Sequence, residues 1–106
     1  MGEKRRLQRV NWFVEAKLHC VEKDLNWNVR LTDISEGGCF VDTIVPLDAG
    51  TNVILMVDDG ANKLDVPGKI LYANAGFGSA IQFDPLEADL RGKILKIMES
   101  RSEGAI

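Results

Sequence analysis

The sequence predicts an all-β fold of about six short antiparallel strands, followed by one helix near the end of the chain. Three observations support this prediction: apolar and polar residues alternate in several segments, short turn-like connections join those segments, and the hydrophobic period changes near residue 85. Strands joined by such short connections pair antiparallel, because parallel pairing requires a longer crossover. The expected arrangement is therefore a barrel or a strongly twisted sheet.

The first two strands show the alternation most clearly. Within residues 13–22, one face carries Val14, Ala16, Leu18 and Cys20 and the other carries Glu15, Lys17 and His19. Successive strand residues point to opposite faces, so this pattern indicates a half-buried strand. A turn precedes a second alternating segment at residues 27–34. Further strands are expected at residues 39–45, 52–59, 64–73 and 79–83, with a bulge or edge irregularity at Pro67-Gly68.

An amphipathic helix is predicted at residues 85–100. Asp84 is a suitable N-cap, Pro85 suits the first helical position, and Glu87 falls where a capping box places its acidic residue. The apolar stripe recurs at helical spacing and consists of Leu86, Leu90, Ile94 and Ile97.

The composition is that of an ordinary globular domain. The 106 residues are 45% hydrophobic and 27% charged, which fits a single domain with a barrel over residues 12–84. No apolar run approaches the roughly 20 residues of a membrane-spanning helix. The basic start of the chain is not followed by the apolar segment of a secretory signal. We therefore expect a cytoplasmic protein without membrane insertion.

The sequence argues against catalysis and metal binding. Cys20 and Cys39 lack the spacing of a metal or redox motif, so both are expected to be reduced, buried thiols. His19 is the one histidine, and it has no cluster of further ligands around it in the sequence. An activated nucleophile with its base is not recognisable either. We expect a protein that is not an enzyme and that holds no metal or cofactor.

Positive charge is concentrated at the start of a net acidic chain. Residues 1–10 contain four of the thirteen Lys and Arg residues and carry a net charge of +3, against −6 for the remainder. Such a segment can be a solvated tail. It can also recognise anions, because arginine stays charged and presents a planar fork of donors that suits phosphate and nucleobases. Arg5 and Arg9 are four positions apart, so both could reach one ligand.

The segment at residues 33–38, DISEGG, is a second candidate site. It can be a strand that ends in a glycine turn, with Asp33 and Ser35 bonded to nearby backbone groups. Alternatively, the Asp33 carboxylate can accept hydrogen bonds from a guanine edge, and Ser35 can donate or accept beside it. Gly38 would then allow a ligand to approach the backbone closely.

In this order and context, the two elements resemble the PilZ domain family over roughly residues 4–98. An RxxxR element precedes the first predicted strand, a DxSxxG element ends the second, and GFGSAIQF at residues 76–83 resembles the family's strand before the final helix. The residues that match the two motifs, including the often-basic position beside the first arginine, are Arg5, Arg6, Arg9, Asp33, Ser35 and Gly38.

The resemblance implies a six-stranded antiparallel β-barrel with a C-terminal helix. It also implies a receptor for the bacterial second messenger cyclic di-GMP (c-di-GMP), with a role in motility or biofilm regulation. Arg5 and Arg9 would contact phosphate and guanine of a ligand that is often an intercalated dimer, and Arg6 would add charge. Asp33 and Ser35 would read a guanine edge, and the motif glycine would allow close approach.

The implied mechanism is a ligand-driven rearrangement of the N-terminal segment. Residues 1–10 are expected to be mobile until the ligand draws them across the barrel, creating a surface for an unidentified effector protein.

Two alternatives stay open: a PilZ-type adaptor that acts without nucleotide, and a small nucleic-acid-binding barrel. The net charge of −3 argues against DNA or RNA as a partner. Trp12 could stack on a base or cover the core, and a monomer or a homodimer is compatible with the sequence.

Overall fold

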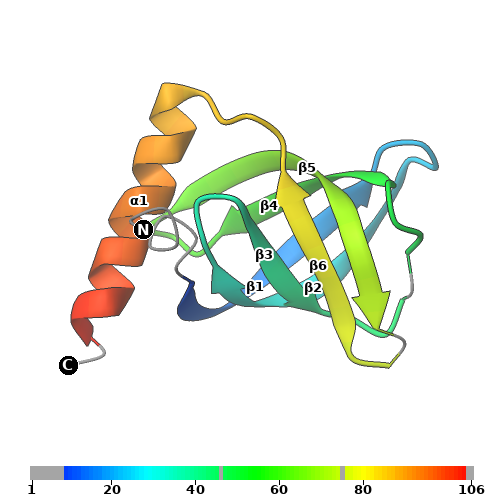
Figure 1. Cartoon of the computed structure of the whole chain (residues 1–106), viewed down its shortest axis with the longest axis horizontal. Coiled ribbons are helices and arrows are strands. Elements are labelled where there is room, and N and C mark those ends of the chain that lie inside the picture. Colours follow the sequence, from blue (N-terminus) through cyan, green and yellow to red (C-terminus); the bar gives the residue numbers. More distant parts are fainter. Residues whose placement is uncertain (1–8, 46, 75, 105–106) are drawn as a thin grey trace, which may run out of the picture.

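A closed six-stranded antiparallel barrel with a helix standing against one end forms the architecture (Figure 1). The structure is a computed structural model that describes residues 9–45, 47–74 and 76–104. The predicted fold class is confirmed. The elements are β1 (Val10–Cys20), β2 (Leu25–Ile34), β3 (Gly38–Asp42), β4 (Asn52–Asp58), β5 (Lys63–Asn74), β6 (Gly78–Phe83) and α1 (Ala88–Gly104).

The strand order around the barrel is β1-β2-β3-β6-β5-β4. Strands β1 to β3 and strands β4 to β6 each form an antiparallel meander, as the short predicted turns require. Pairing of β3 with β6 and of β1 with β4 joins the two meanders and closes the barrel. Closure gives each of the six described strands a hydrogen-bonded neighbour on both sides.

Alternate residues of the strands fill the barrel, as the sequence pattern predicts. In β1, Leu18 and Cys20 are fully buried while Glu15 and Lys17 are exposed. Trp12 is only 4% exposed and belongs to the hydrophobic core, so the tryptophan covers the core in this structure. Because apolar side chains from all six strands meet inside, the interior is a packed core and functional groups lie on the outer surface.

The irregularity expected at Pro67-Gly68 lies elsewhere. Strand β5 runs through both residues, with Pro67 opposite Ile54, and its register against β6 shifts only between Ile70 and Tyr72. The Pro67 carbonyl accepts a hydrogen bond from the Asp84 N–H at 2.9 Å, just beyond the end of β6. The N–H that proline lacks would also face Asp84, where pairing between β5 and β6 ends. This position explains why the strand accommodates a proline.

The helix begins later than predicted. Helix α1 starts at Ala88, and the Glu87 carbonyl accepts the hydrogen bond of the Arg91 N–H at 2.9 Å, which places Glu87 at the N-cap. Asp84 does not cap the helix, because its N–H still pairs with β5 and its carboxylate lies 3.5 Å from Lys69 Nζ. The predicted capping box therefore fails because the barrel ladder continues into the segment that would have formed it.

Helix α1 packs on the barrel through a narrow apolar face. Ile94 and Ile97 are buried in the common core, and Leu90 and Met98 pack beside them. Contacts run mainly to β1 and β5. Within the part of the chain that the structure describes, no helix has the length and apolar content needed to cross a membrane.

We expect Ile94→Ala to lower the free energy of unfolding by about 2–5 kcal/mol, because it removes a fully buried side chain and leaves a cavity. The matched control is Leu95→Ala, which truncates the neighbouring side chain that is 40% exposed and should change stability by less than about 1 kcal/mol. Chemical denaturation followed by circular dichroism measures both, and equal losses would contradict the described packing of α1.

Candidate ligand-binding site

The start of β1 and the end of β2 bring Arg9, the last arginine of the RxxxR element, beside Asp33 of the DxSxxG element. Register pairs Asn11 with Asp33, so Arg9, just before β1, lies beside the Asp33 carboxylate. Arg9 Nη1 is 3.1 Å from Asp33 Oδ1 and 3.4 Å from Oδ2. The Arg9 side chain is 49% exposed and that of Asp33 is 24% exposed, so both remain accessible to a ligand. The predicted Arg5 and Arg6 contacts lie outside the described residues.

A bulge in β2 sets the direction of Asp33. The register of β2 against β3 shifts between Leu31 and Asp33, so Thr32 is an extra residue, and its hydroxyl donates to the Phe40 carbonyl at 3.3 Å. Leu31 and Ile34 on either side are fully buried. The bulge thus allows Asp33 to face outward between two core residues, which is a common use of bulges beside functional sites.

Ser35 shapes the loop that follows. It is 5% exposed, and its hydroxyl donates to the Gly38 carbonyl at 3.3 Å and accepts from the Gly37 N–H at 3.2 Å. The Ser35 N–H also donates to the Gly38 carbonyl, at 2.8 Å. A hydroxyl has one donor and two acceptor positions, so only one acceptor position is left for a ligand. The local turn expected as one alternative is present, and contact with guanine stays a prediction.

Gly38 is held by the barrel itself. A Cβ on Gly38 would overlap the Ile81 carbonyl oxygen of β6, whereas a Cβ on the preceding Gly37 would meet no atom within 4 Å. The close approach of β3 to β6 therefore requires glycine at the last position of the DxSxxG element. Close approach of a ligand at Gly38, the reason expected from the sequence, stays a prediction.

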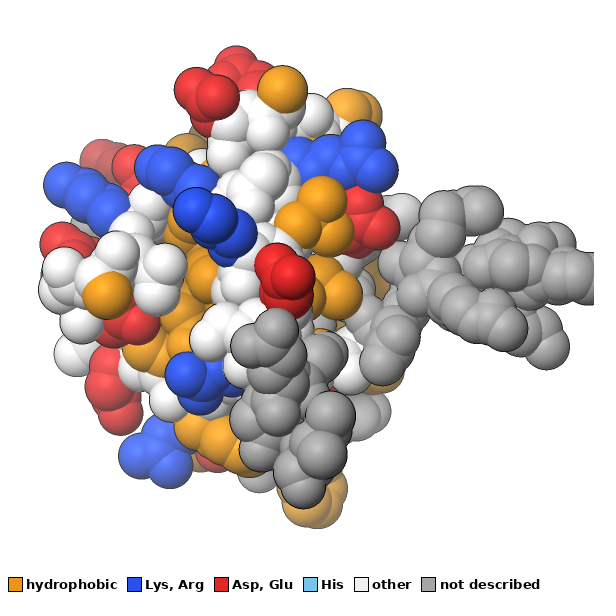
Figure 2. All heavy atoms as spheres, turned by 90° about the vertical axis from the view of Figure 1, so that its left-hand side faces the viewer, with side chains coloured by type: hydrophobic (Ala, Val, Ile, Leu, Met, Phe, Trp, Pro, Cys, Tyr) orange, Lys and Arg blue, Asp and Glu red, His pale blue; other side chains and the backbone are white. Residues whose placement is uncertain are grey.

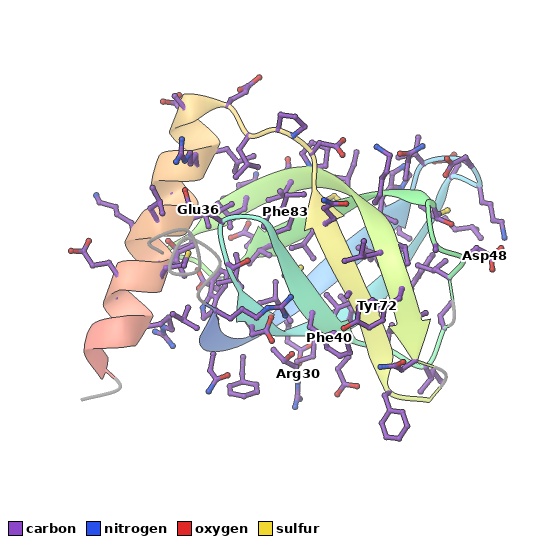
Figure 3. The ribbon with its side chains drawn as sticks, in the orientation of Figure 1. Arg30, Glu36, Phe40, Asp48, Tyr72 and Phe83 are labelled. Atoms are coloured by element: carbon purple, nitrogen blue, oxygen red, sulfur yellow. The ribbon has the colours of Figure 1, made fainter. Side chains whose placement is uncertain are left out.

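An aromatic row on the outer face of the barrel begins beside Asp33 and was not found from the sequence; Phe40 is half-buried, and Ala80, between the two rings, is buried. Cross-strand pairing places Asp33 opposite Phe40, Phe40 opposite Ala80, and Ala80 opposite Tyr72, so these side chains share the outer face of the barrel. Tyr72 is 48% exposed. Figure 3 shows Phe40 and Tyr72 on one side of the barrel, with Arg30 nearby. The row gives flat apolar faces next to a cation and a carboxylate.

A buried thiol lies beneath the site. Burial raises the pKa of Cys39 far above its usual range, the nearby Asp33 carboxylate raises that pKa further, and Arg9 acts in the opposite direction. Cys39 is fully buried and Cys20 is also a free, buried thiol, as predicted. Within the described residues, no three side chains of metal-ligating type gather in one place. The exposed polar groups, Arg9 and Asp33, are suited to binding through charge and hydrogen bonds.

Substituting Gly37 and Gly38 one at a time distinguishes the steric need for glycine at Gly38 from a general effect of changing the loop. Gly38→Ala should lower the free energy of unfolding by about 1–3 kcal/mol, because the new methyl group collides with backbone of β6. Gly37→Ala, in open space, should change it by less than about 1 kcal/mol. Thermal and urea denaturation measure both variants. Indistinguishable stabilities for the two variants would contradict the tight β3–β6 contact.

Comparison with known proteins places this geometry in a family. The PilZ domain profile matches residues 3–100. No curated protein sequence matches the chain. The solved PilZ domain with c-di-GMP of YcgR from Escherichia coli superimposes with a TM-score of 0.76 at 15% identity, covering 96% of this chain and 94% of that chain.

Two further solved structures share the fold. The PilZ domain of CeSA from a cellulose-synthesizing bacterium gives a TM-score of 0.70 at 18% identity, over 85% of this chain and 93% of that chain. The K. pneumonia MrkH–c-di-GMP complex gives 0.78 at 19% identity, over 95% of this chain and 53% of that chain, so this chain spans about half the length of MrkH. With a family profile that spans nearly the whole sequence and the same barrel beneath it, the chain belongs to the PilZ domain family.

Proposed function

We propose that this protein is a receptor for c-di-GMP. The observation that carries the proposal is the Arg9–Asp33 pair, which joins the arginine element and the DxSxxG element on one exposed face. Family membership supports it, and so do the similar structures of YcgR and MrkH, which are described with c-di-GMP. A receptor for a bacterial second messenger would act in the cytoplasm and would not be an enzyme.

The Arg9–Asp33 pair can recognise both the phosphate and the guanine groups of c-di-GMP. The guanidinium of Arg9 can bind a phosphate or the O6 and N7 acceptors of guanine, and the Asp33 carboxylate can accept from the N1–H and N2–H₂ donors of guanine. Without ligand, Arg9 and Asp33 satisfy each other. An exposed ion pair of this kind contributes only about 0–1 kcal/mol, so a ligand that provides new partners for both groups can replace it at small cost.

The remaining site residues extend this arrangement. We assign Arg5 to further contacts with ligand phosphate and guanine and Arg6 to an auxiliary positive charge, since Arg9 places the end of their segment beside Asp33. Ser35 keeps one acceptor position for the guanine edge. Binding would draw the N-terminal arginine segment across the outer face of the barrel and form a surface for an effector protein. In this way ligand binding would shift the population of the protein toward the arrangement that carries the new surface.

The aromatic row extends the site for stacking. Phe40 and Tyr72 follow Asp33 across neighbouring strands, so a guanine held by Asp33 would place the rest of the ligand over these rings. Stacking of a base on an aromatic side chain contributes about 1–3 kcal/mol. We therefore include Tyr72 among the ligand-binding residues.

Isothermal titration with c-di-GMP tests the receptor and both halves of its site. The wild type should bind saturably, and Arg9→Ala or Asp33→Ala should weaken binding by roughly 10- to 100-fold, because each removes a charge-assisted hydrogen-bonding group. The matched controls are Lys23→Ala in the β1–β2 turn and Asp48→Ala at the end of the barrel opposite α1 (Figure 3), which should bind as the wild type does. A folded wild type that gives no heat of binding would favour the adaptor that acts through protein contacts alone.

Two substitutions at Tyr72 test stacking separately. Tyr72→Ala should weaken c-di-GMP binding by about fivefold or more because the ring is lost, and Tyr72→Phe should keep most of the affinity because the ring is retained. Competition with a fluorescent c-di-GMP analogue gives both affinities. Equal affinities for the alanine variant and the wild type would remove Tyr72 from the site.

A further inference from the structure

The loop that follows Asp33 is tied to helix α1 by an ion pair. Glu36 lies in the middle of the DISEGG segment, and both Nε and Nη2 of Arg91 are 2.9 Å from its Oε2. The Glu36 side chain is only 22% exposed, although that of Arg91 is 58% exposed. Two donors on one carboxylate oxygen orient the guanidinium more firmly than a single contact would. A side chain of the helix therefore holds a loop of the candidate site.

A backbone contact joins the same loop to the segment that leads into α1. The Phe83 N–H, at the end of β6, donates to the Gly37 carbonyl at 2.8 Å. Figure 3 shows Glu36 and Phe83 at the end of the barrel that faces α1. Residues 84–87 connect Phe83 directly to the helix. The loop thus meets the C-terminal part of the chain at two consecutive residues, Glu36 and Gly37.

The same helix also contacts the arginine side of the site. Ile97 and Trp12 belong to one core cluster and line one small pocket between α1 and the barrel. Trp12 lies in β1, three residues after Arg9. Helix α1 therefore packs against the strand that positions Arg9 and is bonded to the loop that follows Asp33. A shift of α1 would change the distance between the two halves of the site.

The attachment of α1 is limited. Among the described side chains of the helix, only Ile94 and Ile97 are buried, and the Lys93 Nζ contact with the Lys63 carbonyl is long at 3.5 Å. The face of the molecule seen in Figure 2 mixes basic, acidic and hydrophobic side chains without a single dominant charge. Elements with few buried contacts open at lower free energy than the core. Specific contacts such as Glu36–Arg91 therefore have a large share in fixing where α1 lies.

We propose that α1 positions the two halves of the binding site and that Arg91 is a positioning residue for it. The inference rests on the proposed function, because the affinity that α1 sets is the affinity for c-di-GMP. Arg91 fixes the Glu36 loop relative to Arg9 without touching the ligand. Linkage is reciprocal, so ligand binding strengthens the attachment of α1 to the barrel to the same degree.

A double-mutant cycle measured by isothermal titration with c-di-GMP tests the proposal. Glu36→Gln and Arg91→Gln should each weaken binding about threefold to tenfold, and the double variant should be no weaker than the weaker single variant. If charge alone decided the affinity, Glu36→Gln would instead strengthen binding, because it removes a negative charge near an anionic ligand. Glu99→Gln is the matched control, because it removes a charge from an exposed residue of the same helix that lies outside both the loop contact and the pocket at Trp12, and it should stay within about twofold of the wild type.

Hydrogen exchange adds a measurement that does not depend on the ligand. In the ligand-free Arg91→Gln variant, the amides of Ser35, Gly37 and Phe83 should exchange faster than in the wild type, because the loop has lost its attachment to α1. A wild type that does not bind c-di-GMP overturns the proposed function and this inference with it. A wild type that binds while the glutamine variants match its affinity and its exchange rates overturns the positioning role alone.

Discussion

The pairing of β3 with β6 is the constraint on which the rest of the structure depends. It joins the two meanders, and it brings backbone so close that glycine is required at both ends of the contact. A side chain on Gly38 would meet the Ile81 carbonyl oxygen, and one on Gly78 would meet the Val41 carbonyl oxygen and the Phe40 ring. Without this contact β3 and β6 would both be edge strands, and the core that all six strands share would open.

The candidate site is built directly on this contact. Gly38 starts β3 and closes the loop that Ser35 organises, so the strand pairing fixes the end of the DxSxxG element. Phe40 lies against Gly78 and opposite Asp33, which continues the site across β3 toward β5. The residues that close the barrel and those proposed to bind ligand are thus neighbours. This explains how a small domain can present a rigid binding face on its outer surface while its interior is fully packed.

The Arg9–Asp33 pair gives the site its chemical character. The two opposite charges are 3.1 Å apart, with Arg9 half-exposed and Asp33 24% exposed, so neither group is an unpaired charge before a ligand arrives. Because solvent screens such a pair, it contributes little to stability and can be exchanged for ligand contacts. Arg91 of α1 binds Glu36 in the loop that follows Asp33. Residues 33–38 are therefore bonded to Arg9 at the start of β1, to the end of β6 and to α1.

The sequence predicted the architecture well because strand periodicity and short turns are local signals. Features that depend on contacts between distant residues escaped it. Asp84 looks like a helix cap, but pairing with Pro67 keeps it in the barrel ladder. Tyr72 comes to the same outer face as Asp33 only through cross-strand register over β3 and β6, and Glu36 meets Arg91 across 55 positions of sequence. Arg9 and Asp33 were predicted as parts of one site through the family resemblance, since neither motif alone specifies the contact.

The measurement that tests the account most directly is a paired titration of the wild-type protein with c-di-GMP and with the matched adenine dinucleotide, cyclic di-AMP. The Asp33 carboxylate can accept from both N1–H and N2–H₂ of guanine, whereas adenine presents an acceptor at N1, so a site of this design should discriminate strongly. The account predicts saturable binding of c-di-GMP and at least about tenfold weaker binding of cyclic di-AMP. Equal binding of the two nucleotides, or binding of neither by the folded protein, would contradict it.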